Sequence, residues 1–249
     1  MKLTLTEPKH LKDSIAIVSE LVTETRLKIS KTGITIISMD PANVAMVIYK
    51  LLSSSFSEFE IEEDIELGIN LNNLKQILKR VDSSDIVTLE TDSDASKLKI
   101  TVKGKSVRRF AIPIIESEDR EQKEPSLDFP IEITMPATML SSAIDDADVV
   151  SDAVSFIADK ASFTIKAKGD LNDAEIENAS GDDLKITSSV EEKVTAKYSI
   201  EYLKKMVSGS KISDTVVIQF NADYPVKLSF VTIDKVSLSF VLAPRVEND

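Results

Sequence analysis

The chain has 249 residues, of which 42% are hydrophobic and 29% charged, and it carries a formal net charge of −12. This length is sufficient for two domains of ordinary size, each with its own core. The absence of cysteine excludes disulfides and thiolate metal sites, and the single histidine excludes a metal site built from several histidines. No secretion signal or membrane-spanning apolar run is visible, so we expect a soluble intracellular protein. The negative charge argues against nucleic-acid binding unless the cations gather on one surface.

In chain order, the first half predicts two short helices among antiparallel strands. Apolar residues at helical spacing predict a helix near residues 11–22, and alternating apolar residues predict a hairpin near 26–37. A second helix follows Asn70, whose side chain is a favourable N-cap, and further strands end near residue 114.

The second half repeats this order when 129 is added to each residue number. Leu11 then meets Leu140, and Ser199 takes the N-cap place. Near Leu98 the offset slips to 130, which matches Leu98 with Leu228. Coincidence would not keep one register where the hydrophobic period itself changes, so we infer a tandem duplication. The predicted fold class is α+β, with antiparallel sheets and two short helices in each copy.

The predicted boundaries place the first domain at residues 1–116, a connecting loop at 117–130 and the second domain at 131–249. The loop begins with an almost entirely charged stretch that has no apolar period, which is typical of an exposed linker. Leu127 and Phe129 follow it and require packing partners.

Catalytic motifs are absent from the sequence. No glycine-rich phosphate-binding loop occurs among the six glycines. Asp145, Asp146 and Asp148 could in principle bind Mg²⁺, but neighbouring helix positions point in different directions, which favours a solvated or ion-paired helix face. The alternative function from a different class is an acidic α+β enzyme that uses this aspartate cluster. We expect no enzyme activity, no cofactor and no metal.

Three stretches together carry a resemblance to a known family. These are SMDPANVAMV at residues 38–47, the predicted helix at 71–80 with the strand that follows it, and LAPR at 242–245. The chain resembles PCNA, the DNA sliding clamp family of archaea and eukaryotes, over its whole length. The lack of Cys and Trp is more similar to the archaeal members.

The resemblance implies two tandem clamp domains whose sheets form the outside of a ring and whose helices line it. It implies a homotrimer that encircles duplex DNA, confers processivity on DNA polymerase, and has no catalysis of its own. Implied partners are a clamp loader, DNA polymerase, flap endonuclease and DNA ligase, recruited through a short peptide motif. DNA contact would be weak and independent of sequence, no membrane is involved, and the location would be cytoplasmic in an archaeon or nuclear in a eukaryote. One subunit of a heterotrimeric clamp is the alternative.

The resemblance also implies three sets of site residues. The partner-peptide pocket would comprise Met39, Val44, Met46, Leu127, Phe129, Tyr224, Pro225, Val241, Leu242, Ala243 and Pro244. The DNA-facing cations would be Lys9, Lys12, Lys75, Lys79, Arg80, Lys204 and Lys205. Subunits would meet through edge strands near residues 106–111 and 174–178, with Arg80, Arg108, Arg109, Phe110, Asp145, Asp146, Asp148 and Ile176 at the joint.

Overall fold

The computed structural model describes residues 1–91, 96–116 and 122–245. The chain divides into two compact units, each described by itself below. Unit 1 comprises Met1–Pro41, Val47–Glu124 and Thr232–Leu238, and unit 2 comprises Ala42–Met46, Pro125–Val231 and Ser239–Asp249. The predicted linker segment at residues 117–121 lies outside the described residues.

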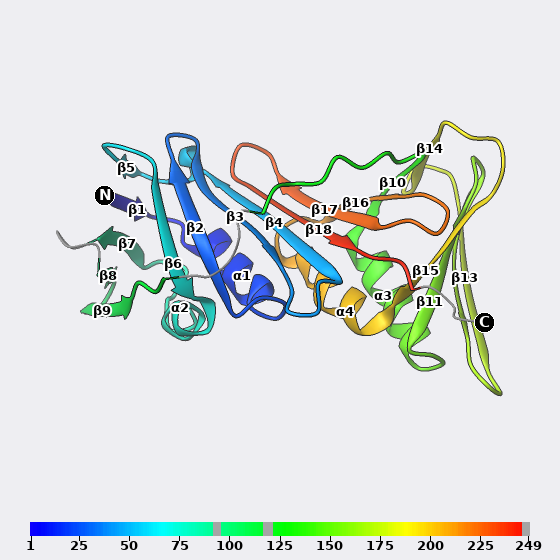
Figure 1. The fold of residues 1–249 in the computed structure, drawn as a ribbon, viewed down its shortest axis with the longest axis horizontal. Coiled ribbons are helices and arrows are strands. Elements are labelled where there is room, and N and C mark those ends of the chain that lie inside the picture. Colours follow the sequence, from blue (N-terminus) through cyan, green and yellow to red (C-terminus); the bar gives the residue numbers. More distant parts are fainter. Residues whose placement is uncertain (92–95, 117–121, 246–249) are drawn as a thin grey trace. The chain divides into compact units, whose positions relative to one another are not determined.

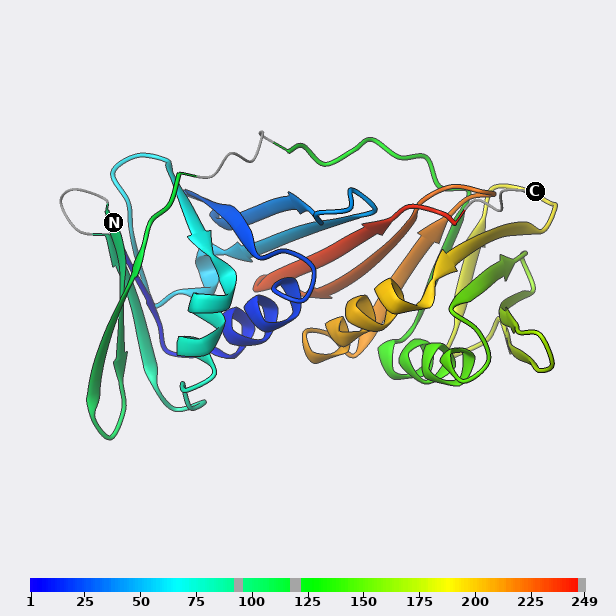
Figure 2. The ribbon, with the colours of Figure 1, turned by 60° about the horizontal axis from the view of Figure 1, so that its bottom comes forward.

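Unit 1 contains two antiparallel sheets and two helices (Figure 1). One sheet has the order β5-β1-β7-β8-β9, and the other contains β4-β3-β2-β6. The helices are α1 (Lys9–Val18) and α2 (Leu71–Leu78), and they pack against each other (Figure 2). The strands are β1 (Lys2–Leu5), β2 (Glu24–Ser30), β3 (Gly33–Met39), β4 (Ala45–Leu52), β5 (Glu58–Glu60), β6 (Ile65–Asn70), β7 (Ile86–Thr91), β8 (Lys97–Lys103) and β9 (Val107–Pro113).

The predicted β2–β3 hairpin has a two-residue turn at Lys31 and Thr32, because Ser30 already pairs with Gly33. Gly33 has φ 137°, and a Cβ added there would lie 2.0 Å from the carbonyl oxygen of Leu51. Only glycine fits both the backbone conformation and this close approach.

Unit 2 has the same architecture. One sheet contains β14-β10-β16-β17-β18 and the other β13-β12-β11-β15, with the helices α3 (Ala137–Asp148) and α4 (Ile200–Val207) packed side by side (Figure 2). Its core includes an aromatic cluster in which Phe156 lies edge-on to Phe163 at 5.3 Å and to Tyr198 at 5.3 Å. The strands are β10 (Ile131–Pro136), β11 (Ala153–Ala158), β12 (Ser162–Lys168), β13 (Asp173–Ala179), β14 (Lys185–Ser188), β15 (Val194–Ser199), β16 (Thr215–Phe220), β17 (Val226–Thr232) and β18 (Val236–Leu242).

The predicted duplication is confirmed by the order and bounds of the elements. β6 and α2 coincide with β15 and α4 when 129 is added to each bound. The predicted slip near Leu98 is wrong. Leu89 pairs with Ile100 in one copy and Ile218 pairs with Leu228 in the other, so Ile100 is equivalent to Leu228 and the offset there is 128 rather than 130. The difference is two residues, which an alternating apolar pattern does not detect because its own period is two.

The two helix N-caps differ in a way that the sequence did not predict. The side chain of Asn70 accepts hydrogen bonds from the backbone N–H groups of Asn72 and Asn73, at 3.0 and 3.2 Å. Ser199 occupies the equivalent position in front of α4, but its side chain makes no capping hydrogen bond. The expectation that Ser199 is an equivalent cap is therefore wrong in its chemistry, although the position is right.

Candidate functional site

The segment that follows β18 is held by backbone hydrogen bonds on both of its sides. The N–H of Ala243 donates to the carbonyl of Val44 at 2.9 Å, and the N–H of Arg245 donates to the carbonyl of Lys197 at 2.7 Å. Asn43, just before Val44, has φ 57°, a conformation that asparagine adopts more readily than most residues. Two of the three stretches that carried the resemblance, residues 38–47 and 242–245, are therefore joined through Val44 and Ala243, which both belong to unit 2.

Two aromatic side chains of the predicted partner site also meet in unit 2. Phe129 lies edge-on to Tyr224, with ring centroids 6.1 Å apart. The turn that carries Tyr224 is fixed because the hydroxyl of Tyr198 donates to the Tyr224 carbonyl at 2.7 Å, and the N–H of Asp223 donates to the Thr195 carbonyl at 3.2 Å. Phe129 therefore has the packing partner that the sequence required.

Burial separates the predicted partner-site residues into a surface group and a supporting group. Leu242 has no exposed surface, and Met46 and Val241 are each 8% exposed. Leu242 was predicted to line the site; its side chain is fully buried in the chain alone and supports the surface from below, and its contact with a partner stays a prediction. The half-buried members of the set in unit 2, which can contact a ligand, are Val44, Leu127, Phe129, Tyr224, Pro225, Ala243 and Pro244. Met39, also half-buried, ends β3 in unit 1.

The strand β9 is a free sheet edge in unit 1, as predicted. At one end of the β8–β9 ladder, the backbone N–H of Ile114 donates to the Ser96 carbonyl. At the other end, the backbone N–H of Gly104 donates to the Ser106 carbonyl. Bonded and non-bonded pairs alternate along an antiparallel ladder, so the backbone groups of Val107, Arg109 and Ala111 point away from β8. Three consecutive outward positions are therefore available for another strand.

The strand β13 is the corresponding free edge in unit 2. The N–H of Ser180 donates to Ala161 and that of Gly169 to Asn172, which fixes the alternation along the β12–β13 ladder. By the same argument, the backbone groups of Asp173, Glu175, Glu177 and Ala179 point outward. We call these two features the β9 edge and the β13 edge.

A cavity of about 580 Å³ lies beside the β9 edge in unit 1. It is lined by Ile77 of α2, by Arg80 just after that helix and by residues of β9 such as Phe110. Arg108 was predicted to form ion pairs across a subunit joint. That stays a prediction; within unit 1 its guanidinium donates to the nearly buried carboxylate of Asp85 and to the Arg80 carbonyl, at 2.5 and 2.7 Å.

The predicted DNA-facing cations fall into two groups. Lys12 donates to the Val81 carbonyl at 2.6 Å, and Lys75 and Lys205 form ion pairs with Glu20 and Glu201. Among the described residues, the side chains of Lys9, Lys79 and Arg80 form no ion pair. They are exposed, two on or directly after α2 and one at the start of α1.

The acidic cluster of α3 has a partner within its own unit. Lys204 contacts Asp148 at 2.5 Å and Asp145 at 3.8 Å, and this hydrogen bond to Asp148 raises the pKa of Lys204 above its ordinary value. Asp145 and Asp148 both contact Lys204 within their own unit, and their predicted pairing with arginines of another subunit stays a prediction. Asp146 is exposed. Lys204 therefore contributes little net positive charge to its helix face.

Within residues 1–91, 96–116 and 122–245, no three His, Cys, Asp or Glu side chains converge closely enough to hold a metal ion. None of the helices in the same ranges combines the length and hydropathy needed to cross a bilayer.

Comparison with known proteins gives full-length similarity. The family model of the N-terminal domain of proliferating cell nuclear antigen matches residues 1–117, and that of its C-terminal domain matches residues 123–245. The chain belongs to the proliferating cell nuclear antigen family. Among curated members, it is 37% identical to the DNA polymerase sliding clamp of Thermococcus gammatolerans over 96% of each chain. It is 34% identical to that of Nanoarchaeum equitans, over 98% of this chain and 99% of that one.

Solved structures confirm the fold expected for this family. The proliferating cell nuclear antigen of Thermococcus kodakaraensis superimposes with a TM-score of 0.91 at 24% identity, over 98% of this chain and 99% of that chain. That of Entamoeba histolytica gives the same score at 21% identity, over 98% of each chain. The predicted fold of two tandem clamp domains with mostly antiparallel sheets is therefore confirmed.

One group of polar residues was missed by the sequence analysis. Lys166, Lys168, Lys197 and Arg245 come together in unit 2, although they lie on three segments of the chain. The available signal was the alternation of Lys166 and Lys168 with buried residues in β12, which places both lysines on one sheet face.

Proposed function

We propose that the protein is a DNA polymerase sliding clamp, a non-catalytic subunit that assembles with two further copies into a ring around duplex DNA. The observation that carries the proposal is the full-length similarity to curated DNA polymerase sliding clamps, which reaches 37% identity over 96% of both chains. It is supported by the match of both family domains in their expected order.

Self-assembly is supported by the two free edges. Pairing of the β9 edge of one subunit with the β13 edge of the next is a heterologous contact, which forms a closed ring when the rotation between subunits suits the subunit number. The charges are complementary: the β9 edge carries Arg109 next to the lysines of β8, whereas the β13 edge presents Asp173 and Glu177. Opposite charges of this kind set partner choice and register.

Direct contact with DNA is proposed to be weak. Lys75, Lys204 and Lys205 have carboxylate partners and Lys12 donates to a carbonyl, so Lys9, Lys79 and Arg80 are the predicted DNA-facing cations without an ion pair among the described residues. Few phosphate contacts mean low affinity with little dependence on sequence. Retention on DNA would therefore come from enclosure by the ring, and weak contact permits sliding.

Recruitment of enzymes is proposed to use the partner site of unit 2. Family partners present a short peptide with a Gln, an aliphatic residue and two aromatic residues. The exposed parts of Val44, Phe129 and Pro244 offer an apolar surface held by the Ala243–Val44 hydrogen bond and the Phe129–Tyr224 contact. Adaptable methionines such as Met46 suit a surface that accepts several partners.

The partner site can be tested with Phe129→Ala and a synthetic peptide of this kind, by titration calorimetry. We expect a loss of affinity of about 30-fold, because truncation of an aromatic residue central to an interface costs about 2 kcal/mol. Phe56→Ala, which removes a half-buried ring in unit 1, is the matched control and should leave binding unchanged. Unchanged affinity of the Phe129→Ala variant, with the fold retained, would contradict the proposed site.

The assembly can be tested by sedimentation of the purified chain alone. The proposal predicts a species of three subunits. A stable monomer would favour the alternative of one subunit in a heterotrimeric clamp, and addition of the other clamp subunits of the same cell would then restore the ring.

A further inference from the structure

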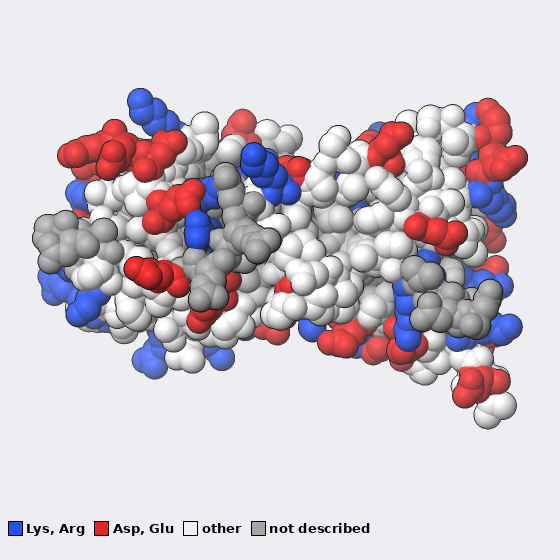
Figure 3. All heavy atoms as spheres, in the orientation of Figure 1, with Lys and Arg blue, Asp and Glu red and all other residues white. Residues whose placement is uncertain are grey.

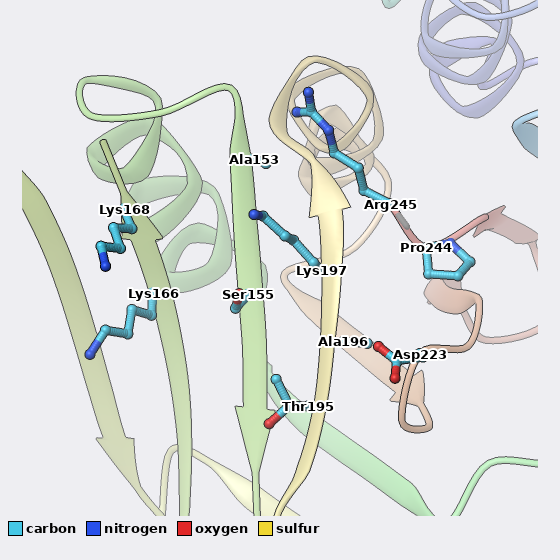
Figure 4. A pocket seen from close by; sticks show the side chains of 10 residues that line it. All are labelled: Ala153, Ser155, Lys166, Lys168, Thr195, Ala196, Lys197, Asp223, Pro244 and Arg245. Atoms are coloured by element: carbon cyan, nitrogen blue, oxygen red, sulfur yellow. The ribbon is translucent and has the colours of Figure 1, made fainter. Parts of the chain in front are cut away.

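A cavity of about 590 Å³ in unit 2 has an excess of positive charge, although the whole chain carries −12. It is formed by β11, β12, β15, the turn before β17 and the segment that follows β18 (Figure 4). Four of its lining residues are cations, Lys166, Lys168, Lys197 and Arg245, against the single carboxylate of Asp223. In Figure 3, Lys and Arg side chains lie among Asp and Glu side chains at this end of unit 2.

The register of the strands explains why a cavity exists here. Ser155 of the central strand pairs with Lys166 on one side and with Lys197 on the other. Adjacent strands lie about 4.8 Å apart, so the two lysines are separated by roughly 10 Å with only a small side chain between them. The small residue forms the floor; in Figure 4, Lys197 reaches toward it from one side, whereas Lys166 extends away from it to Glu175 of β13.

The cations of the cavity are partly neutralised from outside it. Lys166 contacts Glu175 at 2.6 Å, and this hydrogen bond raises the pKa of the lysine. Arg245 contacts Asp152 at 2.9 Å. Lys168 forms no ion pair among the described residues and is exposed. Asp173 lies opposite Lys168 in the β12–β13 pair, so carboxylates surround the cavity, but its lining itself holds four cations against one carboxylate.

The position of the cavity favours a protein ligand over DNA. Ser155, Lys166 and Lys197 alternate along their strands with buried residues, and α3 and α4 pack on the buried side of this sheet. The cavity therefore opens on the sheet face opposite α4, the helix that carries the unit's predicted DNA-facing lysines. It also shares Pro244 with the proposed partner site, so it continues that surface.

We propose that this cavity is a subsite for the carboxylates of an acidic segment that lies next to the apolar anchors of a partner peptide. The inference rests on the proposed function and extends it, because it assigns a charge preference to the sequence that flanks the anchors. Partners with an acidic flank bind more tightly than partners with a neutral flank, and the difference disappears at high ionic strength.

The experiment uses synthetic peptides that share the Gln, aliphatic and aromatic anchors and carry a run of Glu or of Gln on either flank. Calorimetric titrations of the full chain at about 50 mM and about 500 mM salt separate the apolar and electrostatic contributions. At low salt we expect one Glu-flanked peptide to bind about three- to tenfold more tightly than its Gln counterpart, which is the effect of two exposed ion pairs.

The double variant Lys168→Gln/Lys197→Gln should remove this preference and leave the affinity for Gln-flanked peptides unchanged. The matched control is Lys185→Gln, an exposed lysine of β14 outside the cavity, which should retain the preference. Circular dichroism and thermal unfolding establish that the variants fold alike.

Several results would overturn the proposal. Equal affinity for Glu-flanked and Gln-flanked peptides would do so, as would a preference that survives the double variant. A preference that arises only after removal of residues 246–249, which include Glu247 and Asp249, would identify this chain's own acidic segment as the occupant. A loss of duplex affinity in the double variant equal to that of Lys79→Glu would indicate a DNA contact instead. If Gln-flanked peptides bind and only the preference is missing, the subsite alone fails; if no peptide binds, the recruitment function fails as well.

Discussion

The substitution Ala111→Pro isolates the β9 edge from the rest of unit 1. The backbone N–H of Ala111 points away from β8, so its removal breaks no hydrogen bond of the β8–β9 ladder. Proline is tolerated on edge strands when the missing N–H faces solvent, and β9 already ends with Pro113. The variant should therefore fold normally as a single subunit.

The same change should weaken the proposed contact between subunits. If the β13 edge of a neighbour pairs with the β9 edge, one interchain hydrogen bond is lost and a carbonyl of the neighbour is left without its donor. An unsatisfied buried group costs about 1–3 kcal/mol, equivalent to roughly 5- to 150-fold in the dissociation constant of each interface. A closed ring of three subunits contains three such interfaces, so the effect on ring stability is multiplied.

Sedimentation velocity over a range of concentrations measures the effect directly. The wild-type chain should sediment as a species three times the 27.4 kDa mass of the subunit, and the Ala111→Pro variant should dissociate at much higher concentrations. Ala111→Ser keeps the N–H and is the matched control. If Ala111→Pro and Ala111→Ser dissociate at the same concentration while both unfold at the wild-type temperature, the β9 edge is not the subunit contact.

Three further predictions concern DNA contact, helix capping and pH. Lys79→Glu should reduce the slope of log K for duplex binding against log salt by about one, the equivalent of one phosphate contact. Lys185→Glu should leave this slope unchanged. Asn70→Ala should reduce the free energy of unfolding by about 1 kcal/mol because it removes two capping hydrogen bonds. Ser199→Ala should change this free energy much less, because the Ser199 side chain makes no capping hydrogen bond. Equal losses for the two variants in denaturant titrations would contradict this assignment. Burial and the charge of Lys235 lower the pKa of His10 in the folded state. The contribution of neutral His10 to the free energy of unfolding is therefore fully present above the unfolded pKa of about 6.5 and is lost as the pH drops below it. His10→Gln should flatten this part of the curve of unfolding free energy against pH.

Much of the fold could be predicted because its signals are local. The helix α2 is marked by Asn70 and by apolar residues at helical spacing, and its copy α4 has the same bounds displaced by 129. The pairing of Leu98 with Leu228 was wrong because a shift of two residues leaves an alternating pattern unchanged. Only the hydrogen-bond register distinguishes such alternatives, and register depends on strand partners far along the chain.

The candidate sites were harder to predict, because charge and exposure depend on residues from distant segments. Lys204 has the spacing of an exposed helix cation, yet its charge is balanced by Asp148 from a helix more than fifty residues away. Leu242 belongs to a recognisable motif, but five consecutive residues at the end of β18 are buried and no alternation reveals which side chain reaches the surface. Motif similarity therefore predicts a partner site, whereas the exposure of its residues required the structure.

The distribution of charge in unit 2 links the two proposals. On the helix side, the carboxylates of α3 hold Lys204, so that side offers little positive charge to a phosphate backbone. On the opposite sheet face, Lys168 and its neighbours surround a cavity with a single acidic lining residue. In the proposed clamp, acidic side chains would thus reduce DNA affinity where sliding requires weak contact, and cations would remain where a partner peptide could use them. A net charge of −12 is compatible with both roles because each depends on which side chains share a face.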